Sequence, residues 1–405
     1  MTATAAAKPR TLASAWTSPA ATYYLLAASA GILLIIGLAT VLSSSSIDSL
    51  KSTGGNPYAL FFIQLAAFTV GLVALVFGSR LPVVAWKRLA PGILFASIGL
   101  LVLVMLSGIS SGGNKNWIKV GGLVTFQPSE VAKLGLALYL GVVLARFRKN
   151  LTTWKQILIP GGLMSALVVG LVLAGRDMGT AMVLGIIVCA AYWIAGLPIR
   201  FFAMSAFVLA SGIAVLIVEG KSRSARISTW LNPENCDKDA CQQTTHGLWA
   251  LASGGLWGLG PGMSREKWGG LPVPDSDFIF AIIGEEFGLV GTLLVLFAFG
   301  MMVVAVNRIV RRSRDPFVQI AGGAIGAWII GQACINIAVV IGLLPPTGLP
   351  LTLVSSGGSS LIASMAAVGV LMSFARAEPG APEAFAARPN VVRRSLTVLS
   401  GRRRG

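Results

Sequence analysis

The chain has 405 residues, of which 55% are hydrophobic and only 12% are charged. Soluble domains carry about 25% charged residues, so this composition excludes a water-soluble enzyme, a disordered protein and a disulfide-dense secreted module. The net charge of +17 would indicate nucleic acid in a soluble protein, but Lys and Arg also collect in the cytoplasmic loops of membrane proteins. The sequence therefore predicts an integral membrane protein with no nucleic-acid partner.

Apolar runs define the expected spans. A spanning helix needs about 20 mostly apolar residues, and by this criterion we expect about ten of them. They fall at 21–42, 57–78, 90–108, 126–145, 154–174, 179–197, 201–218, 285–307, 317–343 and 357–375. The runs are continuous rather than alternating, which argues against a β-barrel. The expected fold class is an all-α polytopic membrane protein.

Basic residues orient these spans. Arg80, Arg146, Arg200 and Arg308 lie in loops that fall on one side together with both termini. The positive-inside rule makes that side cytoplasmic. We expect a cytoplasmic tail at 1–20, a ten-helix membrane domain at 21–375, and a basic tail at 376–405 that has no fixed structure and contacts anionic lipid.

The connection between the seventh and eighth spans, 219–284, is long and extracytoplasmic in this arrangement. Its tryptophans favour short helices at the lipid interface over disorder. Cys236 and Cys241 lie in this loop, where an oxidising compartment allows a local disulfide. Two free thiols are the alternative, and a metal site with His246 is disfavoured for want of further ligands.

Charged residues at membrane depth are costly and mark functional sites. Glu130 and Lys133 follow Pro128 at the start of a span and are three residues apart on one helical face. They form either a structural ion pair or the wall of a cavity in which Lys133 meets an anion. Asp177, at the turn between two spans, either caps the following helix or lines the same cavity.

Asp277 precedes a long apolar run, Phe278 to Gly284. A carboxylate held against an apolar wall suits a general base, whereas a helix cap before Phe278 is the alternative. Glu285 and Glu286 are expected to be buried polar anchors. Pro and Gly break the backbone at 344–350 and 354–360, around Ser356, which favours a cavity wall over a tight turn.

At these segments the sequence resembles the SEDS family (shape, elongation, division and sporulation; FtsW, RodA and SpoVE). The similarity spans residues 20–375, and its motifs occur in the family's order. The matching residues are Asn116-Trp117-Ile118, Gln127-Pro128-Ser129-Glu130 with Lys133, Asp177-Met178-Gly179-Thr180, Ser253-Gly254-Gly255-Leu256-Trp257-Gly258 with Lys267, Asp277-Phe278-Ile279-Phe280-Ala281 with Glu285-Glu286, Asn336, Gly342-Leu343-Leu344-Pro345, Thr347-Gly348, and Gly357-Gly358-Ser359-Ser360.

The resemblance implies ten membrane helices and a peptidoglycan glycosyltransferase that polymerises lipid II, the undecaprenyl-pyrophosphate-linked disaccharide pentapeptide, outside the membrane. It places the essential acid at Asp277 and implies a class B penicillin-binding protein as partner. The loop 219–284 is most similar to the division branch of high-GC Gram-positive bacteria. That similarity implies other divisome membrane proteins as partners and a site of action at the septal plasma membrane.

The chain departs from the family pattern at several positions. Arg176 replaces the usual Pro before Asp177, and Ser356 stands where many members have Tyr. Where the family often reads Leu-Pro-Glu-Ala-His-Thr-Asp, this chain has Leu-Pro-Val-Pro-Asp-Ser-Asp, so that Asp275 replaces the His. Asp275 and Asp277 are therefore candidates for a shared proton or metal site.

In the mechanism we expect, Asp277 removes the proton from the acceptor hydroxyl, and one inverting displacement needs no second carboxylate, unlike a retaining glycosidase. Positive charge rather than a general acid would stabilise the leaving pyrophosphate. The candidates are Lys133, Arg226, Arg265, Lys267 and a divalent cation, Mg or Mn. Alternatives are an elongation-type polymerase that controls cell shape, a lipid II flippase, and a scaffold for a penicillin-binding protein.

Overall fold

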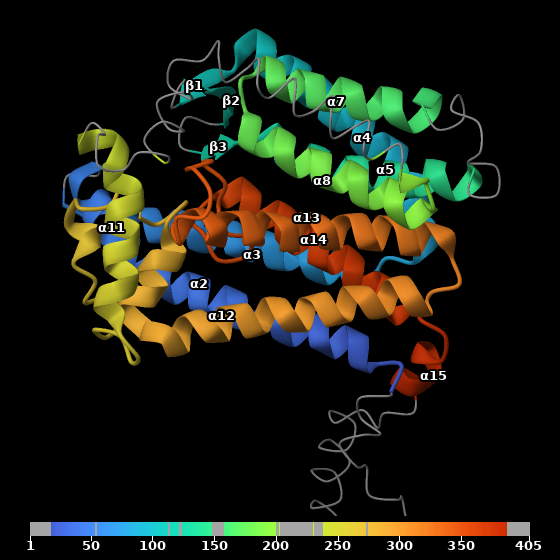
Figure 1. Ribbon diagram of the computed structural model, residues 1–405. Helices are drawn as coiled ribbons and strands as arrows, with labels where there is room; N and C mark the ends of the chain where they lie inside the picture. Colours follow the sequence, from blue (N-terminus) through green and yellow to red (C-terminus); the bar gives the residue numbers. More distant parts are fainter. Residues whose placement is uncertain are drawn as a thin grey trace, which may run out of the picture.

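The computed structural model describes residues 18–52, 55–111, 114–120, 124–147, 158–199, 202, 230, 238–272 and 274–386. Long helices run side by side in a bundle, and three short strands and one crossing helix cover an end of it (Figure 1). The helices of the bundle are α2 (Ala21–Ser52), α3 (Ala59–Arg80), α4 (Val83–Ser107), α5 (Pro128–Phe147), α7 (Leu163–Ala174), α8 (Met178–Ala195), α12 (Ile279–Arg312), α13 (Pro316–Val340) and α14 (Gly358–Arg376).

Seven of the described helices are long and apolar enough to cross a membrane, namely α2, α3, α4, α8, α12, α13 and α14. The all-α membrane fold class is confirmed; α5 lies at the expected span 126–145, and α7 covers the later part of the expected span 154–174. A π-helical turn, η2 (Leu158–Gly162), leads into α7. The span expected at 201–218 lies outside the described residues except for 202, so the count of ten stays a prediction.

Several helices begin or end beyond the expected apolar runs. Helix α4 starts at Val83 rather than at residue 90 and contains Pro91 in its interior. Lys87, in its first turns, pairs with Asp315 at 2.6 Å, so the basic segment expected as a loop is helical. Helix α12 starts at Ile279 and therefore includes the two glutamates that were expected to begin the span.

A small antiparallel sheet, not predicted from the sequence, follows α4. It consists of β1 (Ile109–Ser111), β2 (Asn114–Val120) and β3 (Val124–Phe126), in the order β1-β2-β3. Trp117 faces Ile109 across one ladder, and Ile118 faces Phe126 across the other. The amide of Lys115 donates to the carbonyl of Gly175 at 3.0 Å, which ties the sheet to the turn between α7 and α8.

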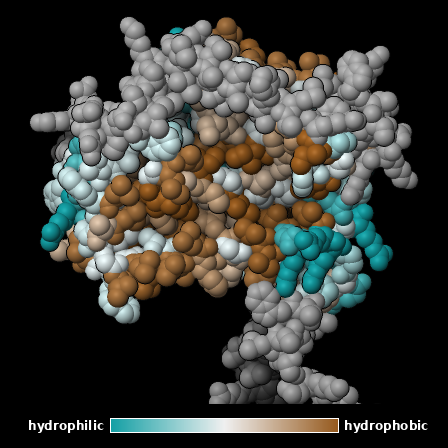
Figure 2. Space-filling model, in the orientation of Figure 1, coloured by the Kyte–Doolittle hydropathy of each residue, from teal (hydrophilic) through white to brown (hydrophobic). Residues whose placement is uncertain are grey.

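The core lies where α13 and α14 pack against α3, α5, α8 and α12. Trp328 of α13 is fully buried. At Gly369 of α14, an added Cβ would lie 2.6 Å from the carbonyl oxygen of Leu75 on α3, so a small residue permits this close helix contact, as in other membrane bundles. Apolar side chains cover the middle of the face drawn in Figure 2, with hydrophilic ones toward its ends.

The two ends of the bundle differ in charge. Helices α3, α5, α12 and α14 carry basic residues in their last turns: Arg80, Arg146, Arg311, Arg312 and Arg376. These helices end at the side of the bundle where α15 (Ala381–Ala386) lies (Figure 1). This arrangement agrees with the expected cytoplasmic face. The tail expected to lack structure begins with this short helix, whose Phe385 packs edge-on against Tyr23 at 5.4 Å.

The opposite end carries the described part of the long loop. Helix α11 (Lys238–Gly254) crosses the end of the bundle, and the short 3-10 helix η4 (Glu266–Trp268) follows it (Figure 1). Trp249, Trp257 and Trp268 are exposed there, as expected for helices at a lipid interface. Arg226, Cys236 and the side chain of Cys241 lie outside what the structure describes, so the disulfide stays a prediction.

Candidate active site

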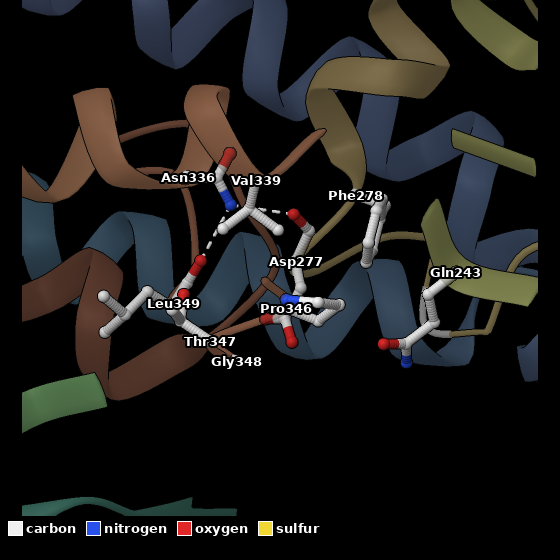
Figure 3. A pocket seen from close by; sticks show the side chains of 9 residues that line it. All are labelled: Gln243, Asp277, Phe278, Asn336, Val339, Pro346, Thr347, Gly348 and Leu349. Carbon is white, nitrogen blue, oxygen red and sulfur yellow. Dashed lines mark hydrogen bonds between the residues drawn. The ribbon is translucent and has the colours of Figure 1, made fainter. Parts of the chain in front are cut away.

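Asp277 is half-buried at the start of α12 and lines a pocket at the end of the bundle (Figure 3). Helix α12 begins at Ile279 with Phe278 in the cap position, so Asp277 lies one residue outside the cap. The pocket is lined by Gln243, Asp277, Phe278, Asn336, Val339, Pro346, Thr347, Gly348 and Leu349. It therefore brings together α11, α12, α13 and the segment rich in Pro and Gly, as a cavity wall requires.

Asn336 of α13 fixes the backbone on both sides of this pocket. Its amide nitrogen donates to the carbonyl oxygen of Asp277 and to that of Leu349, each at 2.7 Å (Figure 3). Asn336 is itself buried. Because buried hydrogen-bonded groups are costly to unpair, this side chain holds the two segments at a set separation.

Two serines of the segment after α13 hold the residues just before Asp277. Ser355 Oγ donates to the carbonyl of Ser276, and Ser356 Oγ donates to Asp275 Oδ2, both at 2.7 Å. Ser276 Oγ in turn donates to Asp277 Oδ1 at 3.0 Å. Burial raises the pKa of the Asp275 carboxyl, and the nearby Asp48 raises it further, whereas the hydrogen bond from Ser356 lowers it.

Glu130 and Lys133 form an ion pair inside the bundle. Lys133 Nζ lies 2.8 Å from Glu130 Oε2, donates to Gln332 Oε1 at 3.0 Å and lies 5.0 Å from the centre of the Trp328 ring. Lys133 is fully buried. The geometry is that of a structural pair joining α5 to α13, and the ammonium would reach a substrate anion only if the bundle opened.

Asp177 joins three segments of the fold. It accepts from the Thr180 amide at 3.0 Å as the cap of α8, and from the Thr180 hydroxyl at 2.8 Å. Asn116 of β2 and Gln127 before α5 donate to its second oxygen at 2.9 and 3.0 Å. Its geometry is therefore that of the helix cap considered above, extended to hold the sheet in place.

Lys267 is bonded to helix α12, which begins two residues after Asp277. The residue is buried, and its ammonium donates to Ser43 of α2 at 2.8 Å and pairs with Glu286 of α12 at 3.4 Å. Glu285, also buried, accepts from Ser264 and from the Arg265 amide. The two glutamates are thus buried polar anchors, as expected, while the side chain of Arg265 is exposed.

Two buried glutamines near the site were not predicted from the sequence. Gln64 of α3 donates to the Ser355 carbonyl at 3.3 Å and accepts from the Gly357 amide at 3.2 Å. Gln332 accepts from Trp328 and from Lys133. Each is an uncharged amide inside an apolar run. Because buried amides need hydrogen-bond partners, a glutamine within an apolar run is the feature of the sequence that could have indicated them.

The bundle and the half-buried carboxylate at its end define a multi-pass membrane protein with a polar site at one membrane face. The family model described as a cell cycle protein, FtsW/RodA/SpoVE, matches residues 23–379. The chain therefore belongs to the FtsW/RodA/SpoVE family.

Similar proteins come from several bacteria. The chain is 39% identical over 396 residues to a probable peptidoglycan glycosyltransferase FtsW of Mycobacterium tuberculosis, covering 97% of this chain and 75% of that protein. It is 33% identical over 351 residues to the stage V sporulation protein E of Bacillus subtilis, covering 85% and 94%.

Solved structures share this fold. A chain from a peptidoglycan synthase complex, studied for its coordination of polymerization and crosslinking, superposes with a TM-score of 0.70 at 26% identity, covering 88% of this chain and 96% of that one. The rod shape determining protein RodA of Thermus thermophilus superposes with a TM-score of 0.62 at 26% identity, covering 91% and 99%.

Proposed function

We propose that this chain, a peptidoglycan glycosyltransferase of the bacterial membrane, polymerises lipid II at the outer face with Asp277 as its base, for septal wall synthesis. The observation that carries the proposal is the position of Asp277, a half-buried carboxylate that lines a pocket at the end of the bundle opposite the basic helix ends. The division role is supported by the identity to FtsW proteins.

In the proposed reaction, Asp277 takes the proton from the 4-hydroxyl of the acceptor sugar. The oxygen attacks the anomeric carbon of the donor, the new glycosidic bond forms with inversion, and undecaprenyl pyrophosphate leaves with the bonding electrons. Because the leaving group is already anionic, it needs no proton. Asn336, which donates to the Asp277 carbonyl, holds the base relative to the pocket.

Positive charge for the leaving group comes from an exposed cation or a metal ion in this proposal. Of the described candidates, Arg265 is exposed, whereas Lys133 and Lys267 are buried with partners. No three His, Cys, Asp or Glu side chains gather around a metal position within the described ranges. A magnesium or manganese ion shared with substrate phosphates takes only one or two protein carboxylates. Asp277 lines the pocket, whereas Asp275 Oδ2 accepts from Ser356, so Asp277 is the carboxylate that would hold such an ion.

We also propose a class B penicillin-binding protein and other divisome membrane proteins as partners. The related chain from a peptidoglycan synthase complex supports an assembly of this kind. The partner would cross-link the strand that this chain polymerises.

The test is polymerisation of labelled lipid II by the purified chain with its partner. We expect glycan polymer from the wild type and a loss of about 10²–10⁴-fold in rate for Asp277→Ala. Movement of lipid II across vesicles without polymer would favour a flippase instead. Polymer made by the partner alone would favour a scaffold.

A further inference from the structure

Asp275, just before the proposed base, and Ser356, in the segment after α13, contact each other. Ser356 Oγ donates to Asp275 Oδ2 at 2.7 Å, and the Ser356 amide donates to the Asp275 carbonyl at 2.9 Å. The residues are 81 positions apart in the sequence. The two residues therefore act as one unit, and a change at either side chain removes a partner of the other.

This pair belongs to a clamp on the segment that carries the proposed base. Asp275 lies two residues before Asp277, Ser355 donates to the carbonyl of Ser276 between them, and Asn336 donates to the carbonyl of Asp277 itself. Successive residues of this segment are thus held from the side of α13 and the segment after it. A shift at Asp275 would be transmitted along a short piece of backbone to Asp277.

The segment 351–357, which bonds to the residues before Asp277, has a strained backbone. Leu353 is buried and has φ of 66°, a region that costs a bulky residue about 1–3 kcal/mol. Ser355 Oγ accepts from the Leu351 amide at 2.7 Å, and Gln64 of α3 bonds both Ser355 and Gly357. Strain of this kind persists only where surrounding contacts fix the backbone, and it clusters at functional sites.

A carboxylate at position 275 costs folding free energy that an uncharged side chain would avoid. The carboxyl group is half-buried and lies near the acidic Asp48, and desolvation of a carboxylate costs free energy unless hydrogen bonds offset it. The Ser356 hydroxyl supplies such a bond. The Asp275 carboxylate therefore contributes little to the stability of the fold, and a role in the reaction is the better explanation for it.

We propose that Asp275 and Ser356 are positioning residues for the transfer reaction, acting together to hold Asp277 at the pocket. The inference rests on the proposed role of Asp277 as base. Small displacements of a reacting group are expensive in catalysis, since about 1 Å can cost about 100-fold in rate. The pair therefore affects turnover more than substrate binding.

A double-mutant cycle tests the pair, with the purified chain, its partner and labelled lipid II as substrate. The variants are Asp275→Ala, which removes the acceptor, Ser356→Ala, which removes the donor, and the double substitution. We expect each single variant to lower kcat about 10- to 100-fold with little change in KM. The double variant should be no slower than the more impaired single one, because both remove the same interaction.

Three controls separate positioning from folding. Ser356→Thr keeps the hydroxyl and should retain most of the wild-type kcat. Ser364→Ala removes a buried hydroxyl that donates to carbonyls of its own helix α14, and kcat should not change. The thermal unfolding temperature of each purified variant should stay near that of the wild type.

Multiplicative losses in the double variant would overturn the proposal, as would wild-type kcat in both singles or a loss confined to KM. A Ser356→Thr variant that is folded but has a kcat as low as that of Ser356→Ala would also contradict it. The proposed base is tested separately by Asp277→Ala. If Asp277→Ala is inactive while the losses in the cycle are multiplicative, the positioning role of the pair is wrong and the role of Asp277 as base is retained. If Asp277→Ala is active, the role of Asp277 as base is wrong.

Discussion

Lys133 and Asp177, two of the charged side chains predicted at membrane depth, are bonded to other parts of the chain. Lys133 contacts Glu130, Gln332 and Trp328, and Asp177 accepts from a helix amide and two side-chain amides. The half-buried Asp277 at the pocket differs in that its environment is open on one side. At the residue scale, burial therefore separates structural charges from the proposed catalytic one.

Removing one partner of the buried ion pair should destabilise the fold. Glu130→Ala leaves the ammonium of Lys133 buried without its countercharge, at an expected cost of about 3–5 kcal/mol in the free energy of unfolding. Thermal unfolding of the purified protein measures the effect. Glu130→Ala combined with Lys133→Met should recover most of the loss, and a single variant as stable as the wild type would contradict the structural role.

Asp177 offers a sharper test of cap against cavity. Asp177→Ala removes the acceptor for the Thr180 amide and should cost about 0.5–2 kcal/mol, whereas Asp177→Asn keeps a capping oxygen and should lose less stability. If Asp177 acted on substrate through its charge, Asn would abolish polymerisation of labelled lipid II as fully as Ala does. We expect Asn to retain most of the activity.

The elements show what the sequence could predict. Apolar runs located the long helices, because spanning the membrane demands about 20 apolar residues wherever the helix packs. The start of α4 differs from the expectation because the basic Lys87 and Arg88 interrupt the apolar run and were assigned to a loop, yet the helix extends back to Val83. The sheet was missed because its three-residue strands β1 and β3 show too little alternation to signal a strand.

The interruption of α12 could also not be read from the sequence. At Gly288 the backbone has φ of 64° and ψ of −160°, and the segment after α11 fills the break. The amides of Leu259 and Gly260 donate to the carbonyls of Glu285 and Glu286 at 2.9 and 3.0 Å. A glycine within an apolar run is common in membrane helices, so only the three-dimensional pairing identifies this one as a break.

Replacing Gly288 should prevent this pairing. In Gly288→Ala the new Cβ would lie 2.4 Å from the Gly258 nitrogen and 2.5 Å from the Leu256 oxygen, in a region of φ that disfavours a side chain. We expect a lower unfolding temperature and less purified protein. Gly300→Ala on the same helix meets nothing within 4 Å and should behave as the wild type; equal behaviour of both variants would contradict the break.

At the scale of the whole molecule, the two ends of the bundle differ. The last turns of α3, α5, α12 and α14 are basic, whereas the proposed site, the sheet and α11 lie at the other end (Figure 1). The sequence could predict this arrangement because the positive-inside rule acts on each loop separately. It could not predict the pocket, whose walls come from segments far apart in the chain.

The predicted orientation can be measured by cysteine labelling. In a background with the four native cysteines replaced by serine, an impermeant maleimide should label Met263→Cys in intact spheroplasts, since Met263 is exposed at the end of the bundle that we expect to face outward. Arg314→Cys, between α12 and α13, should be labelled only after permeabilisation. The reverse pattern would contradict an outward-facing site.

The most direct test of the central claim is the rate of glycan polymerisation by Asp277→Asn, which keeps the shape of the side chain but removes the basic carboxylate. With the purified chain, its partner and labelled lipid II, we expect the rate to fall about 10²–10⁴-fold while the unfolding temperature stays near that of the wild type. Polymer formed at the wild-type rate would contradict the assignment of Asp277 as the base.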